Sequence, residues 1–180
     1  MWSARPFNLN SCIRPRAVEY GLSSIKIGGG RMDESTSTRL RQIWNQTAVP
    51  VLYRRGPGNP LLVRLPWQPG NRAWLHAIGR RHPAWIASER YWELPQAWFE
   101  KLVGRCLDKF EQVYIIQPYR EQEKCAPACW SAQGETCECS CMGVNHGTNG
   151  SGSGWKIVSE AFATRWGAQH LACRLLTRSR

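Results

Sequence analysis

The amino-acid sequence predicts an α+β fold, with a mixed or antiparallel sheet of about five or six strands packed on one main helix. Short β-prone runs alternate with Gly- and Pro-rich turns, and one long run repeats its apolar residues at helical spacing. A cysteine-rich segment precedes a final pair of β-prone runs. The chain has 180 residues, 42% of them hydrophobic, which fits one domain with its own core.

Residues 1–31 differ from the rest of the chain. They show no clear period and end in Gly28-Gly29-Gly30, directly before Met32. We therefore expect an N-terminal extension, either disordered or added by a misassigned start codon, with translation beginning at Met32. The remaining residues, 32–180, are expected to form a single α+β domain.

The first half of this domain alternates short helices and strands. Acidic residues at 33–34 suit a helix start, and breakers such as Gly56-Pro57-Gly58 separate the β-prone runs. We expect helices at Ser35–Trp44 and Arg72–Ile78, and strands at Val49–Arg54, Leu61–Trp67, Pro83–Ile86 and Tyr91–Leu94.

The main helix is predicted at Gln96–Phe110, because Trp98, Leu102, Cys106 and Phe110 form one apolar stripe at helical spacing. A β-branched strand and a closing hairpin around Gly167-Ala168 should follow. The expected strands are Gln112–Gln117 and, in the hairpin, Trp155–Trp166 and His170–Arg178. The domain is thus expected to have three regions: a core at 46–119, a cysteine-rich knuckle at 120–147 and the C-terminal hairpin at 155–178.

The knuckle is predicted to bind Zn²⁺, because five of the eight cysteines and one histidine lie close together. Ligands four residues apart can converge in a turn, and alternate residues of an extended Cys-x-Cys-x-Cys run point to one side. The candidate ligands are Cys125, Cys129, Cys137, Cys139, Cys141 and His146. The preferred set is Cys125, Cys129, Cys139 and His146, with Cys137 and Cys141 as competitors.

Other interpretations of the knuckle stay open. Two metals could share bridging thiolates, an Fe–S cluster could replace zinc, or the thiols could be free. A structural site is favoured over a catalytic one, although Glu135 and Glu138 could supply acid–base chemistry. Cys12, Cys106 and Cys173 are isolated in the sequence. Because no export signal is evident, we expect metal ligands rather than disulfides, in a cytoplasmic protein.

The stretch from about Leu61 to Phe110 resembles the HARP domain of HepA-related annealing helicases. The resemblance rests on an apolar strand, a short polar helix, the basic turn Gly79-Arg80-Arg81-His82-Pro83, the aromatic pair Trp85 and Trp92, and an amphipathic helix. It implies DNA binding without chemistry in this module. The knuckle lies outside the HARP pattern and indicates a separate family of small prokaryotic or phage-type proteins.

Charge supports the same interpretation. The formal net charge is +11, which makes polyanions plausible partners. Arginine suits phosphate, and exposed aromatic rings can stack on bases. We expect DNA, in preference to RNA, to be bound by Arg54, Arg55, Arg72, Arg80, Arg81, Arg90, Trp85 and Trp92, although packing of the two tryptophans in the core is the simpler interpretation.

The predicted function is thus non-catalytic, zinc-stabilised nucleic-acid binding. No apolar run reaches the ~20 residues that a membrane span needs. A zinc-dependent nuclease-like enzyme is one alternative, but its best acids, Glu89, Glu93 and Glu160, form no motif. A protein-interaction adaptor that docks through the knuckle is the other alternative.

Overall fold

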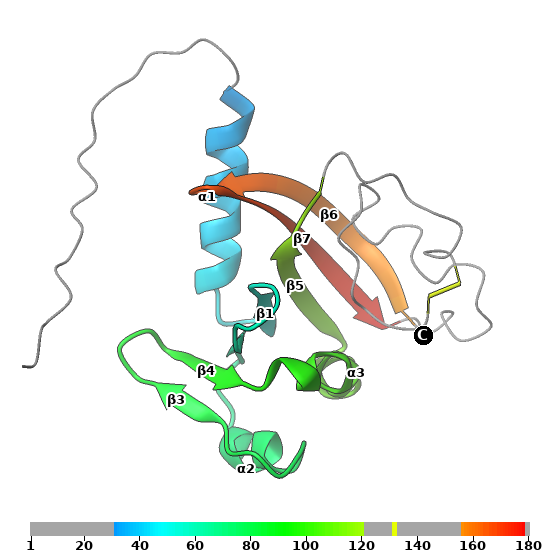
Figure 1. Ribbon diagram of the computed structural model, residues 1–180. Helices are drawn as coiled ribbons and strands as arrows, with labels where there is room; N and C mark the ends of the chain where they lie inside the picture. The colour runs from blue at the N-terminus through cyan, green and yellow to red at the C-terminus, as the bar shows by residue number, and fades with distance from the viewer. Residues whose placement is uncertain (1–30, 121–130, 133–155, 179–180) are drawn as a thin grey trace, which may run out of the picture.

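The computed structural model describes residues 31–120, 131–132 and 156–178, and the strands in these ranges form one seven-stranded sheet (Figure 1). Its order is β3-β4-β2-β1-β5-β7-β6, and β1 and β5 form the parallel pair. The strands are β1 Val51–Arg54, β2 Leu61–Arg64, β3 Ala84–Ile86, β4 Tyr91–Leu94, β5 Gln112–Pro118, β6 Lys156–Trp166 and β7 Gln169–Arg178. The helices are α1 Arg31–Asn45, α2 Asn71–His76 and α3 Phe99–Phe110, with a 3₁₀ turn, η1, at Gln96–Trp98.

The α+β prediction with a mixed sheet is confirmed, and the sheet is larger than expected. The predicted C-terminal hairpin is also confirmed: β6 and β7 pair antiparallel around a two-residue loop, Gly167-Ala168. Gly167 has φ +60°, a backbone conformation that glycine adopts without steric cost. No helix within the described ranges is long and apolar enough to cross a bilayer.

Strand β7 lies between β5 and β6, and pairs antiparallel with both. Strands β5 and β6 therefore run in the same direction. Pro118, at the end of β5, lies level with Leu171, whereas Lys156, at the start of β6, lies level with Arg178. The chain thus leaves the sheet at one end of β5 and re-enters it at the opposite end, on β6.

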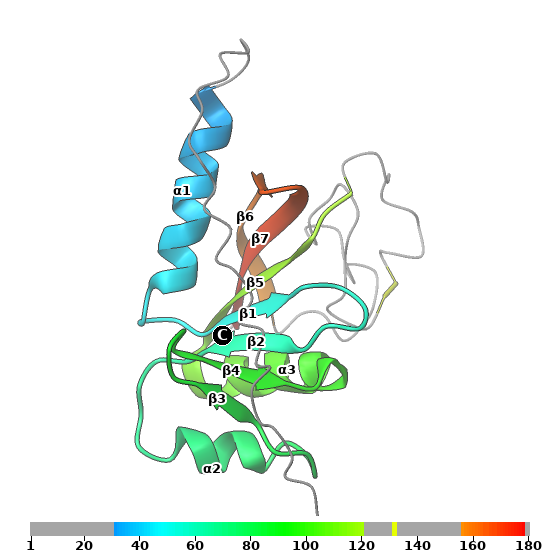
Figure 2. The same cartoon turned by 60° about the vertical axis from the view of Figure 1, so that its left-hand side comes forward.

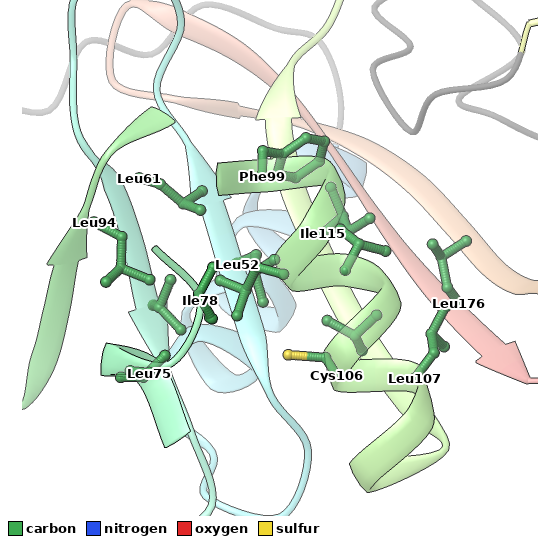
Figure 3. Close-up of a cluster of buried hydrophobic side chains, with 14 residues drawn as sticks. Leu52, Leu61, Leu75, Ile78, Leu94, Phe99, Cys106, Leu107, Ile115 and Leu176 are labelled. Carbon is green, nitrogen blue, oxygen red and sulfur yellow. The ribbon is translucent and has the colours of Figure 1, made fainter. Parts of the chain in front are cut away.

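One face of the sheet packs against α3 and α2 (Figure 3). The predicted stripe of α3 faces this core: Leu102 and Cys106 are fully buried, and the partly buried Trp98 and Phe110 pack against it. Burial raises the pKa of the Cys106 thiol far above its usual value, so that this side chain stays a neutral, apolar core residue. Glu111 ends the helix in the left-handed conformation.

The other face of the sheet packs against α1. Neighbouring residues of a strand point to opposite faces, so Leu52 contributes to the α3 core and Val51 to a second core with Leu40 and Ile43 of α1. Arg39 forms a 2.5 Å ion pair with Glu160 of β6. The sheet is therefore covered by helices on both faces, and α1 adds a layer beyond the single main helix that the sequence predicted.

Candidate nucleic-acid interface

Three basic side chains of α3 contact α2 or the residues that directly follow it. Both helices lie in the lower half of Figure 2, away from α1. Lys101, Arg105 and Lys109 are four residues apart and so share one face of α3. The Nζ atom of Lys101 donates to the backbone oxygen of Ile78 at 2.6 Å, and Arg105 donates to that of Ala77 at 3.5 Å. These donors bond to carbonyl groups directly after the C-terminal end of α2, where the helical hydrogen-bond pattern has stopped.

Trp74, an aromatic side chain of α2, contacts two of these three cations. The guanidinium carbon of Arg105 lies 5.1 Å from the Trp74 ring centroid, and the Nζ atom of Lys109 lies 4.8 Å from it. Trp74 in turn meets Phe110 edge-on, with centroids 6.0 Å apart. Cation–π contacts at these distances are attractive, so the two cations are held in place on the surface.

The turn after α2 carries the arginines that the sequence singled out. Arg80 and Arg81 are both exposed, and Gly79 precedes them. A Cβ atom on Gly79 would lie 2.7 Å from Cζ2 of Trp98, so the backbone passes directly over the indole ring. The two arginines therefore project from a turn whose backbone position is fixed by a core tryptophan. We call Arg72, Arg80, Arg81, Lys101, Arg105 and Lys109 the α2 basic cluster.

Gly79→Ala is expected to destabilise the protein by about 1–3 kcal/mol, because the added methyl overlaps the Trp98 ring. Gly79 does not have a positive φ, so backbone strain does not contribute. Chemical denaturation would measure the loss. Gly104→Ala in α3 is the matched control, since its Cβ would meet nothing within 4 Å; helix propensity should make that variant more stable. Equal losses in both variants would contradict the Gly79–Trp98 contact.

The structure divides the predicted phosphate-binding arginines into groups. Arg72, Arg80 and Arg81 belong to the α2 basic cluster. Arg54 is the last residue of β1, and Arg55 follows it. Because β1 and β3 run in opposite directions, both arginines lie at the end of the sheet where β3 begins. Arg54 stacks over Phe99, 5.9 Å from its centroid. Arg90 lies in the β3–β4 turn, at the opposite end of these strands and apart from the other arginines.

The predicted aromatic pair is brought together. Trp85 and Trp92 are directly opposite each other on β3 and β4, with ring centroids 5.0 Å apart. Trp92 packs against the α3 core, which favours the packing interpretation for this residue. Trp85 is 48% exposed, so a free part of its ring surface lies at the edge of the sheet, on the same face as α2 and α3.

The acidic residues considered for an enzyme are not brought together. Glu89 lies in the exposed β3–β4 turn, Glu93 lies on β4, and Glu160 lies on β6 with Arg39 as its partner. Strands β2, β1, β5 and β7 separate β4 from β6. Among the described residues, no group of three or more His, Cys, Asp or Glu side chains could hold a metal ion.

The six candidate zinc ligands, Cys125 to His146, lie outside the described residues, so zinc binding stays a prediction from their spacing. Two of the three cysteines that are isolated in the sequence, Cys106 and Cys173, are free and buried. No family model, curated protein or solved structure matches the chain. The HARP resemblance therefore also stays a prediction.

Half of the α2 basic cluster was missed by the sequence analysis. Lys101, Arg105 and Lys109 were assigned no role, because the helix that carries them was interpreted through its apolar stripe alone. Their spacing of four residues was the available signal, since it predicts a second, basic stripe on the same helix. The sequence did not indicate that this stripe would face α2.

Proposed function

We propose that the chain is a non-catalytic, zinc-stabilised nucleic-acid-binding protein, and that it binds phosphates through the α2 basic cluster. The observation that carries the proposal is that three cations of α3 contact α2 or the residues directly after it, a segment that also carries the exposed Arg72, Arg80 and Arg81. Residues 71–83 contain three arginines and no acid. Of the acids on α3, Asp108 is directed towards Arg178 of β7, at 3.6 Å.

The geometry of the cluster suits an extended polyanion better than a single small anion. Helix α2 has six residues, and a helix of that length spans about 9 Å. Duplex DNA carries one charge per about 1.7 Å of helix axis, so a surface of this length faces several phosphates. The three cations of α3 are also held in position by aromatic rings and by oxygen atoms of α2 and the residues after it, which lowers the entropy lost when they bind phosphate. DNA is the first ligand to test.

The test is fluorescence anisotropy of the full, zinc-loaded chain with single-stranded, double-stranded and forked DNA and with RNA, across a salt series. If four to six cations of the cluster contact phosphates, log K for duplex should fall with log salt with a slope of about −4 to −5. Absence of binding at about 0.15 M salt would refute the proposal. Loss of intact substrate during the titration would instead favour the nuclease alternative.

A further inference from the structure

One large aromatic side chain stands almost fully in solvent on the loop between β2 and α2. Trp67 is 85% exposed, the higher value of the two exposed large hydrophobic side chains in the described ranges. A single exposed apolar residue is common on protein surfaces and carries no meaning alone. The loop that presents Trp67 provides the second observation.

This loop is fastened to the first residue of α2. The Asn71 side chain donates from Nδ2 to the backbone oxygen of Pro66 at 2.8 Å, and its backbone N–H donates to Gln68 at 3.3 Å. Trp67 therefore lies between two residues, Pro66 and Gln68, that both accept hydrogen bonds from Asn71. Prolines at positions 66 and 69 further restrict the backbone. The indole ring is thus presented to solvent by a constrained loop.

The same asparagine also positions a cation. The Oδ1 atom of Asn71 accepts a hydrogen bond from Nζ of Lys109 at 3.2 Å. Arg72 follows Asn71 in the chain and is exposed. The N-terminal end of α2 therefore combines an open aromatic ring with two cations of the α2 basic cluster. This combination matches the repeating unit of a nucleic-acid strand, which has a flat base beside a phosphate.

We propose that Trp67 stacks on an unpaired base, and that the protein therefore prefers single-stranded nucleic acid, with Lys109 and Arg72 binding the adjoining phosphates. This inference rests on the proposed function and narrows its ligand. The bases of an intact duplex already stack on each other, so Trp67 could reach one only after unstacking that costs a few kcal/mol. An unpaired base offers its face directly.

The test compares Trp67→Ala with the wild-type full chain on a single-stranded oligonucleotide and on a blunt, fully paired duplex, by anisotropy across a salt series. Stacking is worth about 1–3 kcal/mol per base, so single-strand affinity should fall by about 5- to 150-fold. Duplex affinity and the salt slopes should not change, since no phosphate contact is removed. Trp67→Phe should restore most of the loss, and Gln68→Ala on the same loop should have no effect.

An oligonucleotide with abasic positions tests the same contact from the ligand side. Wild-type protein should bind it about as weakly as Trp67→Ala binds the normal strand, and the two losses should not add. Equal affinity of Trp67→Ala and wild type for the normal single strand would overturn the Trp67 inference while leaving the α2 basic cluster in place. Absence of all nucleic-acid binding by the wild type would overturn the proposed function together with the inference.

Discussion

Replacing both Arg80 and Arg81 with alanine is expected to weaken nucleic-acid binding strongly and to flatten its salt dependence. Each lost phosphate contact removes about 0.9 from the salt slope for duplex DNA and about 0.7 for single strands. If the variant and the wild type bind equally at about 1 M salt, the loss of two contacts makes duplex binding roughly 60-fold weaker at about 0.1 M salt. Single-strand binding becomes roughly 25-fold weaker at the same salt concentration. Both side chains are exposed, so the melting temperature should stay close to that of the wild type.

The matched control removes two positive charges at a distance from the cluster. Arg90→Asn combined with Arg165→Gln acts at the β3–β4 turn and on the C-terminal hairpin. Arg90 has φ +58°, and asparagine tolerates this conformation better than alanine does. If the control variant lost as much affinity and salt slope as Arg80→Ala/Arg81→Ala, binding would reflect net charge, and the α2 basic cluster would not be the interface.

The strands and the main helix could be predicted from the sequence because their signals are local. Gly- and Pro-rich turns mark the strand ends, and the apolar stripe through Leu102 and Cys106 has a helical period that requires a buried face. The C-terminal hairpin was predictable for the same reason, since a two-residue loop with Gly167 brings adjacent strands together. Each of these features depends on residues that are close in the chain.

Pairings between distant segments could not be predicted in this way. The hairpin could join the sheet through either strand, and the sequence did not indicate that β7 would pair with β5. Helix α1 was expected, but its packing on the second face depends on distant partners such as Glu160 and Thr164. The separation of Arg90 from Arg80 and Arg81 likewise follows from strand direction. Arg80 and Arg81 precede the start of β3, whereas the turn with Arg90 follows its end.

The candidate site shows the same limit. Composition and charge indicated a basic surface, and the turn at Arg80-Arg81 was identified from its sequence. The contribution of α3 was missed because it depends on how two helices pack: Lys101 and Arg105 reach carbonyl groups of Ile78 and Ala77, more than twenty residues away. Trp67 was overlooked because its exposure becomes apparent only when the other apolar residues have been placed in the core.

Replacing Cys125 and Cys129 together with serine is expected to abolish zinc binding by the predicted knuckle. Thiolates contribute much of the binding energy, and apparent energies for structural zinc in finger peptides are about 10–16 kcal/mol at neutral pH. Loss of two of four ligands should reduce the zinc content, measured by elemental mass spectrometry, to background. Cys12→Ser, outside the cluster, is the matched control and should keep the wild-type zinc content. Iron and sulfide in the wild-type protein would instead indicate an Fe–S cluster.

The same variant should also destabilise the sheet, because of how the knuckle segment connects to it. The chain leaves β5 at Pro118 and returns at Lys156 at the opposite end of the sheet, so 37 residues (119 to 155) close one long connection. Metal ligation would shorten the loop that this connection has to close, and losing it should cost about 1 kcal/mol of loop-closure entropy. For a protein of this size, that loss lowers the melting temperature by about 2–4 °C. A double variant with wild-type zinc content and an unchanged melting curve would show that these two thiols do not ligate the metal.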